Sequence, residues 1–296
     1  MKVAVIGGNG QLGSDLVLAL SDKGYDTAAL THSDIELSTL DSVARCLRGL
    51  HPDVVVNTAA MHHVDDCERN PAQAYAVNAL GVRHLAVVTG ELGAVLIHVS
   101  TDYVFDGSKG SPYAEEDAPL PVNVYGNSKL AGEYFVRSIN PKHFVLRTSA
   151  LYGKHPCRAK RGQNFVDLML RLGREKGRVR VVDSEFVSPT STLDLARQIV
   201  ALSSTDAFGL YHATAEGSCS WYEYAREIFA IAGMSVAVEI ASSREFPAKV
   251  PRPCYSVLEN SALKRCDLNL FEPWQAGLSK YLSKPENVSL LISGGV

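Results

Sequence analysis

A tyrosine and a lysine stand four residues apart, at Tyr125 and Lys129. If this stretch is helical, the two side chains share one face. An ammonium group beside a phenol favours the phenolate, and such a tyrosine can give a proton to a carbonyl oxygen while hydride reaches the carbon. With 12 tyrosines in the chain, such a pair can also arise by chance as a solvated surface pair. The spacing therefore predicts carbonyl reduction only if its surroundings agree.

Three polar residues, Ser100, Thr101 and Asp102, directly follow an apolar run at 95–99. Polar residues at the carboxyl end of a parallel strand face the ligand crevice. We expect the Thr101 hydroxyl to hydrogen-bond the substrate carbonyl and orient it. The alternative is that these residues only cap a helix or form a turn.

A glycine turn follows the first apolar run of the chain, with Gly7, Gly10 and Gly13 spaced as G-x-x-G-x-x-G. A tight turn, close approach of the backbone to a pyrophosphate and close packing of helix on strand each favour a residue without Cβ. The amides at the start of the following helix would then face the anion. The pattern predicts a dinucleotide site, although three glycines can also form an ordinary turn.

The end of the second predicted strand bears on which dinucleotide binds. Enzymes that use NAD usually carry an acid there for the ribose 2′-hydroxyl. This strand ends in Thr31, His32 and Ser33, and the first acid, Asp34, comes late. The absence of a carboxylate at the strand end favours NADPH, with NADH as a second option; His32 could also be an ordinary surface residue.

Alternating strands and helices would have to position these groups. Short apolar strands are predicted at 3–6, 27–30, 53–56, 94–99 and 143–146, with helical spacing at 12–20, 40–47, 72–92 and 124–136. This order predicts an α/β fold, a Rossmann-type doubly wound parallel sheet. Further helices are expected at 165–172, 193–202, 221–232 and 274–282, with a strand at 179–182. We assign 1–150 to a dinucleotide-binding domain, with 190–212 returning to it, and 151–296 mainly to a smaller α/β substrate lobe.

The composition excludes several classes of protein. The chain has 296 residues, of which 46% are hydrophobic and 21% charged, and its net charge is −3, so we expect no disorder, no nucleic-acid partner and no membrane partner. The N-terminal apolar stretch is too short for a signal peptide, which predicts a cytoplasmic protein. The six cysteines show no C-x-x-C spacing, so they are expected to be reduced, mostly buried thiols without zinc.

Several stretches together resemble the extended short-chain dehydrogenase/reductase superfamily and, within it, the dTDP-4-dehydrorhamnose reductase family. The stretches that carry the resemblance are 7–13 (GGNGQLG), 52–57 (PDVVVN), 64–68 (VDDCE), 100–105 (STDYVF), 125–133 (YGNSKLAGE), 146–149 (LRTS), 188–190 (SPT), 221–225 (WYEYA) and 252–253 (RP). They extend over nearly the whole chain, so the resemblance concerns the protein as a whole.

The resemblance implies reduction of the 4-keto group of a nucleotide-activated 6-deoxy sugar with NAD(P)H. Tyr125 would be the proton donor, Lys129 would hold the nicotinamide ribose, and Thr101 would complete the catalytic set. The further residues expected at the cofactor are Gly7, Asn9, Gly10, Gln11, Leu12, Gly13, His32, Glu36, Leu37, Ala59, Ala60, Asn78 and Ser100. Those expected at the nucleotide sugar are Val64, Asp65, Asp102 and Arg252.

This sequence departs from the family pattern around the sugar. The family often has tryptophan where this chain has Ala150, so an aromatic wall is missing. Two alternatives stay open: an epimerase or dehydratase of the same superfamily, and a non-catalytic NADP-binding regulatory subunit like that of methionine adenosyltransferase. Neighbouring His62 and His63 have no third ligand at suitable spacing, so we expect no metal. The basic run 158–161 is read as a solvated loop rather than a phosphate contact. A monomer and a homodimer fit equally well.

Overall fold

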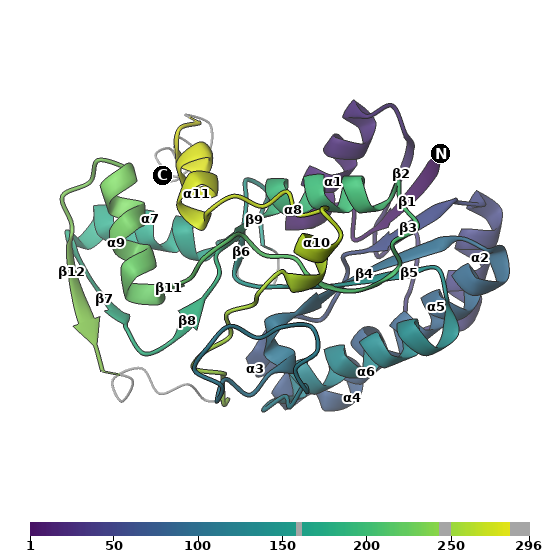
Figure 1. Ribbon diagram of the computed structural model, residues 1–296, viewed down its shortest axis with the longest axis horizontal. Coiled ribbons are helices and arrows are strands. Elements are labelled where there is room, and N and C mark those ends of the chain that lie inside the picture. The colour runs from purple at the N-terminus through teal and green to yellow at the C-terminus, as the bar shows by residue number, and fades with distance from the viewer. Residues whose placement is uncertain (158–161, 243–249, 285–296) are drawn as a thin grey trace.

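A six-stranded parallel sheet forms one part of the molecule in the computed structural model, which describes residues 1–157, 162–242 and 250–284. Its strands are β1 (Lys2–Ile6), β2 (Asp26–Leu30), β3 (Val54–Asn57), β4 (Val95–Thr101), β5 (His143–Thr148) and β10 (Gly209–His212). They stand in the order β10-β5-β4-β3-β1-β2, and the sheet occupies the right-hand part of Figure 1. The chain therefore reverses its direction of travel across the sheet between β1 and β3, where this class of sheet opens a crevice for its ligand.

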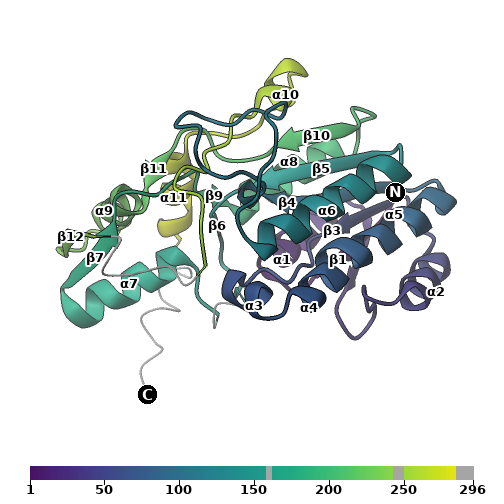
Figure 2. The same ribbon diagram turned by 90° about the horizontal axis from the view of Figure 1, so that it is seen from below.

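Helices cover both faces of the sheet, as Figure 2 shows. On one face lie α1 (Gln11–Asp22) and α8 (Thr192–Leu202), whose Leu16 and Ile199 pack in one cluster with Val3 and Val5 of β1. On the other lie α2 (Leu40–Leu50), α5 (Gly81–Leu92) and α6 (Val124–Ile139), against the alternate β1 side chains. The doubly wound sheet predicted from the alternating elements is confirmed.

The segment predicted as one helix over 72–92 is more complex. The structure has α3 (Val64–Arg69), α4 (Pro71–Tyr75), a π-helical turn at Ala76–Leu80 and then α5. A π-turn inserts an extra residue into the helical ladder and rotates the side chains that follow it. Apolar spacing over 72–92 alone does not locate this turn, because the turn occupies only the five residues Ala76–Leu80 and regular helix flanks it on both sides.

A smaller part packs beside the sheet and contains mostly later residues. It comprises α7 (Phe165–Lys176), β7 (Arg178–Val182), α9 (Trp221–Ile231), β12 (Ala237–Ala241) and α11 (Trp274–Leu282). Asn164 and Ser220 each begin a helix with a capping box, at α7 and α9. Five short pieces went unrevealed by the sequence, as did β12: β6 (Leu151–Tyr152), which pairs with β9 (Thr190–Ser191), β8 (Phe186–Val187), which pairs with β11 (Cys219–Ser220), and α10 (Ser261–Arg265).

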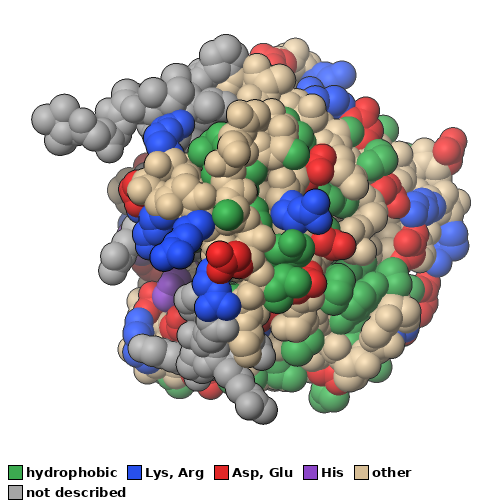
Figure 3. Space-filling model, turned by 90° about the vertical axis from the view of Figure 1, so that its left-hand side faces the viewer, with side chains coloured by type: hydrophobic (Ala, Val, Ile, Leu, Met, Phe, Trp, Pro, Cys, Tyr) green, Lys and Arg blue, Asp and Glu red, His purple; other side chains and the backbone are tan. Residues whose placement is uncertain are grey.

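After β7 and the short strands of the smaller part, the chain returns to the sheet at α8 and β10 and then re-enters the smaller part at α9. β10 pairs with β5 in parallel, from Gly209 beside Phe144 to His212 beside Arg147. The outer end of the smaller part, seen in Figure 3, carries positive and negative side chains interspersed with apolar ones. Arg180 of β7 and Glu239 of β12 form an ion pair at 3.5 Å. Among the described residues, no helix combines the length and the apolar character needed to cross a bilayer.

The cysteines differ from expectation. Only Cys67 and Cys219 are buried, whereas Cys254 and Cys266 are exposed and Cys46 and Cys157 are intermediate. The expectation of mostly buried thiols was wrong because Cys254 lies in the loop after Pro253 and Cys266 follows the last turn of α10. All six are free thiols.

Candidate active site

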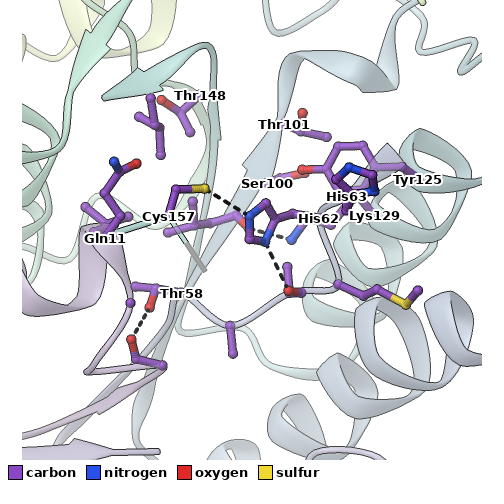
Figure 4. A pocket seen from close by; sticks show the side chains of 18 of the residues that line it. Gln11, Thr58, His62, His63, Ser100, Thr101, Tyr125, Lys129, Thr148 and Cys157 are labelled. Atoms are coloured by element: carbon purple, nitrogen blue, oxygen red, sulfur yellow. Dashed lines mark hydrogen bonds between the residues drawn. The ribbon is translucent and has the colours of Figure 1, made fainter. Parts of the chain in front are cut away.

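A cavity of about 710 Å³ lies at the carboxyl ends of the sheet strands and extends toward the smaller part. Figure 4 shows Gln11 and Thr58 on one side of it and Tyr125, Thr101 and Lys129 on the other. Most of the residues predicted from the sequence line this cavity: Gly7, Asn9, Gly10, Gln11, Leu12, Gly13, His32, Glu36, Leu37, Ala59, Ala60, Val64, Ser100, Thr101, Asp102, Tyr125, Lys129 and Arg252. Residues far apart in the sequence thus meet around one space.

The glycine turn has the geometry that an anion site needs. Gly7 has φ +77°, which a residue with Cβ adopts at a cost, and a Cβ at Gly13 would stand 2.1 Å from the Gly7 carbonyl oxygen. The first turn of helix α1 therefore packs directly on the backbone that follows β1. Gly10 begins it, and no side chain of the described residues caps its first amides. Those amides stay available to a diphosphate.

The close contact of Gly13 with Gly7 predicts a sharp result for Gly13→Ala. The added methyl meets backbone rather than a flexible side chain, so the start of α1 must move, and we expect NADPH binding to weaken at least about tenfold. Gly49→Ala is the matched control, because Gly49 lies in α2 and a Cβ there meets nothing within 4 Å. Fluorescence titration with NADPH measures both; unchanged affinity in Gly13→Ala would contradict the assignment.

Tyr125 is placed by the cap of its helix. The Asn123 side chain accepts a hydrogen bond from the Gly126 amide at 2.9 Å, which fixes the first turn of α6. Burial raises the pKa of Tyr125 above its ordinary value, and a hydrogen bond with the Thr101 side chain opposes this shift. The lowered pKa that we expected from Lys129 is therefore not found: burial dominates, and the phenol stays protonated and able to donate.

Lys129 lies one turn further along α6 and is 2% exposed. Its Nζ donates to the Val99 carbonyl oxygen at 2.7 Å and lies 3.4 Å from Nε2 of His98. Burial lowers the pKa of Lys129 to about 8, although the charge of Glu133 acts in the opposite direction. Lys129 therefore titrates close to neutral pH.

A buried ion pair supports the helix that carries both residues. Arg147 of β5 donates three hydrogen bonds to the Glu133 carboxylate, from Nε at 3.0 and 3.2 Å and from Nη2 at 2.7 Å, and the Ser100 hydroxyl donates another at 2.5 Å. Glu133 is 0% and Arg147 2% exposed. The pair ties α6 to β4 and β5, so that Tyr125 and Lys129 are held against the ends of these strands.

Asp102 forms a polar cluster beside the tyrosine. Its carboxylate accepts hydrogen bonds from Thr101 at 3.0 Å and from Ser149 at 2.8 Å. Burial raises the pKa of Asp102, while hydrogen bonds from Ser256, Ser149 and Thr101 oppose the shift. Tyr103 also lines the cavity and meets the Tyr125 ring edge-on at 5.8 Å between centroids.

The end of β2 forms a loop rich in hydroxyl groups. The Asp34 carboxylate turns back to accept from the Thr31 amide and hydroxyl, at 2.8 and 2.7 Å. His32 is exposed and lies 3.3 Å from Glu36, with both residues on the cavity wall. The acid that could oppose a 2′-phosphate is thus engaged with its own loop.

Two predicted site residues lie outside the lining of the cavity. Asn78, in the π-helical turn, is 1% exposed; its amide accepts from the Met61 N–H and donates to the Met61 carbonyl, both at 2.9 Å. Asn78 thereby holds the loop after β3 from the side that faces away from the cavity. Asp65 lies in the first turn of α3. Direct contact of either residue with a ligand stays a prediction.

The far end of the cavity includes residues that the sequence did not assign to it. These are chiefly Thr148, Ser149, Cys157, Glu185, Val187 and Trp221. Trp221 packs on Phe165 and also lines the cavity. Thr148 ends β5, so the rule applied to Thr101 could have found it. Cys157 lies 3.5 Å from Nε2 of His62 (Figure 4). The basic run 158–161 lies outside the described residues.

The sequence similarity to known proteins extends over almost the whole chain. The family described as RmlD substrate binding domain matches residues 1–286. A dTDP-4-dehydrorhamnose reductase of Mycobacterium tuberculosis is 40% identical over 292 residues, which is 97% of this chain and 94% of the relative. The spore coat polysaccharide biosynthesis protein SpsK of Bacillus subtilis is 38% identical over 283 residues, 96% of this chain and 97% of its own.

A solved structure agrees with these relatives. The dTDP-4-dehydrorhamnose reductase of Bacillus anthracis, crystallised with NADP, superposes with a TM-score of 0.91 at 38% identity, over 95% of this chain and 98% of that one. The fold and the groups around the cavity define an oxidoreductase of the extended short-chain dehydrogenase/reductase type. Within that class, the chain belongs to the RmlD family, which confirms the resemblance stated from its motifs.

Proposed function

We propose that this protein uses NADPH to reduce the 4-keto group of a dTDP-activated 4-keto-6-deoxy hexose, with Tyr125 as the proton donor. The observation that carries the proposal is the meeting of Tyr125, Thr101 and Lys129 with the glycine turn around one cavity. The sugar nucleotide is inferred from the names of the relatives, several of which are dTDP-4-dehydrorhamnose reductases.

The residues present fit a dinucleotide. The turn at Gly7 and Gly13 leaves no room for a Cβ, and the uncapped start of α1 offers amides to a diphosphate. At the end of β2, His32 can donate to a 2′-phosphate, and the Ser33 hydroxyl can do so by turning away from Thr31, whose own hydroxyl is engaged by Asp34. We therefore propose NADPH as the preferred cofactor, with NADH accepted more weakly.

The chain's own groups perform the proton chemistry. A bound nicotinamide supplies the hydride. The Thr101 hydroxyl orients the keto oxygen, and the buried Tyr125 phenol, whose pKa is raised, gives its proton to that oxygen as negative charge develops. Lys129, when charged, stabilises the phenolate that remains and holds the ribose hydroxyls beside it. Arg252, on the cavity wall, is suited to the diphosphate of the sugar nucleotide.

The proposal is tested by supplying purified protein with NADPH and dTDP-4-keto-6-deoxy hexoses that differ in configuration. We expect loss of nicotinamide absorbance in step with a reduced sugar product, and a lower KM for NADPH than for NADH. Isomerised sugar without net oxidation of NADPH would instead indicate an epimerase. Absence of turnover with every such sugar would overturn the proposal.

Nothing in the structure favours either alternative function. A regulatory subunit that only binds NADP has no need of a tyrosine, a lysine and a threonine that meet at the cavity, and the relatives reported above include named reductases. The particular sugar depends on the wall at Ala150, which has φ +45° and contributes only a methyl group where the family often has an aromatic ring. A cytoplasmic location and a domain boundary near residue 150 stay predictions.

A further inference from the structure

A chain of three buried polar side chains runs behind the wall of the cavity. Asn57 ends β3, His98 lies in β4, and Lys129 reaches the cavity from α6. Asn57 and His98 are 0% exposed, and neither lines the cavity. His98 therefore has no access to a ligand, and its effect on the site can pass only through its neighbours.

The orientation of Asn57 fixes the proton on His98. The Ala59 amide donates to Oδ1 of Asn57 at 3.2 Å, so the Nδ2 amino group faces Nδ1 of His98, at 3.1 Å. An amide nitrogen only donates, so Nδ1 of His98 accepts and the ring proton sits on Nε2. Burial and the neighbouring Lys129 hold the pKa of His98 well below its ordinary value, so the ring stays neutral.

This tautomer directs an N–H group at Lys129. Nε2 of His98 lies 3.4 Å from Nζ of Lys129, and Nζ also donates to the Val99 carbonyl at 2.7 Å. An ammonium group has only donors, so the charged lysine sets N–H against N–H. A neutral amine instead accepts from Nε2–H with its lone pair while it donates to Val99. The contact favours the uncharged form.

The other charged and titratable groups near Lys129 come from two elements. On α6 these are Tyr125, which stays protonated, and Glu133, whose charge favours the ammonium. From β5, Arg147 pairs with Glu133 and so offsets part of that charge. From β4, the His98 side chain contacts Nζ of Lys129, whereas Val99 contacts it through its backbone carbonyl. Protonation of Lys129 is thus balanced between Glu133 on one side and burial with His98 on the other.

We propose that His98 is a positioning residue that keeps Lys129 poised to gain its proton when the dinucleotide binds. The diphosphate brings negative charge, and the ribose hydroxyl oxygens accept hydrogen bonds from an ammonium, so cofactor binding and protonation of Lys129 favour each other. The inference rests on the cofactor site of the proposed function but does not depend on which sugar is reduced.

The first test follows NADPH affinity against pH in His98→Gln and His98→Asn. In the wild type, the dissociation constant should rise about tenfold per pH unit above the pKa of free Lys129. A glutamine oxygen accepts from the ammonium, so in His98→Gln the rise should begin roughly one to two pH units higher. His98→Asn only removes the N–H and should shift the rise less, in the same direction.

His212→Asn is the matched control. His212 is an equally buried imidazole outside the cavity lining, and its Nδ1 lies 3.0 and 3.1 Å from the carbonyl oxygens of Tyr113 and Glu259. Its loss should lower stability without moving the pH dependence of NADPH affinity. If both His98 variants follow the wild-type pH profile, the proposal is wrong, and His98 serves packing alone.

The second test uses the wild-type protein, so it depends neither on the folding of a variant nor on enzymatic turnover. Nitrogen-15 spectra of the histidine rings should show His98 as a neutral Nε2–H tautomer and His212, which donates from Nδ1, as the opposite one. An Nδ1–H tautomer at His98, or its protonation at neutral pH, would overturn the proposal. Failure to reduce any sugar would count against the proposed function only, since both tests read the cofactor site directly.

Discussion

Replacing Tyr125 with phenylalanine should lower kcat for reduction of the sugar nucleotide by about 100- to 10,000-fold, the usual contribution of a general acid. The dissociation constant of NADPH should change little, because the phenol oxygen is lost while the ring and the Lys129 side chain stay in place. Steady-state kinetics at saturating NADPH, together with a binding titration, measures the two effects separately.

The control for this variant is Tyr134→Phe. Tyr134 lies on the same helix, α6, but its side chain is 53% exposed and outside the cavity lining. This substitution should leave both kcat and NADPH affinity unchanged. A Tyr125→Phe enzyme as active as Tyr134→Phe would show that the proton comes from another group, and the buried Asp102 carboxyl would be the first to examine.

The largest expected loss of stability follows from breaking the buried ion pair. Glu133→Ala leaves the Arg147 guanidinium, 2% exposed, without its carboxylate partner. A buried charge stripped of its partner costs about 3–5 kcal/mol of unfolding free energy. Urea denaturation followed by circular dichroism measures this loss as a lower transition midpoint with an unchanged slope.

An exposed ion pair provides the comparison. Arg48 and Glu91 meet at 2.8 Å, but their side chains are 58% and 52% exposed. Solvent screens such a pair, so Glu91→Ala should lower the unfolding free energy by no more than about 1 kcal/mol. Equal losses in Glu91→Ala and Glu133→Ala would mean that burial adds nothing to the Glu133 pair, contrary to our account of how α6 is held.

The strands and helices around the cofactor site could be predicted because burial dictates their patterns. A strand covered on both faces, such as Val3–Ile6, must be continuously apolar, and a helix packed on one face repeats every three to four residues. The π-helical turn at Ala76–Leu80 and the two-residue strands of the smaller part could not be found, because their backbone pairing depends on tertiary contacts rather than on local patterns.

The candidate site divides in a similar way. Gly13 and Tyr125 were found because the chemistry requires those residue types at fixed spacing within one element. Trp221 and Cys157 reach the cavity from the smaller part, and only the packing of that part on the sheet brings them there. His98 carried no sequence signal, since an isolated histidine in an apolar strand gives no hint of which side chain its ring will meet.

The return of the chain at β10 means that residues 1–150 do not contain the whole of the six-stranded sheet. A polypeptide ended at residue 150 would lose the strand that covers β5, and the N–H and C=O groups beside Phe144 and Leu146 would become a bare sheet edge. The same truncation would remove α8, whose apolar side chains pack in one cluster with those of α1. The walls of the dinucleotide cavity that come from residues 1–150 therefore depend for their support on residues that follow much later in the chain, so we expect the cavity to form only once α8 and β10 have been added.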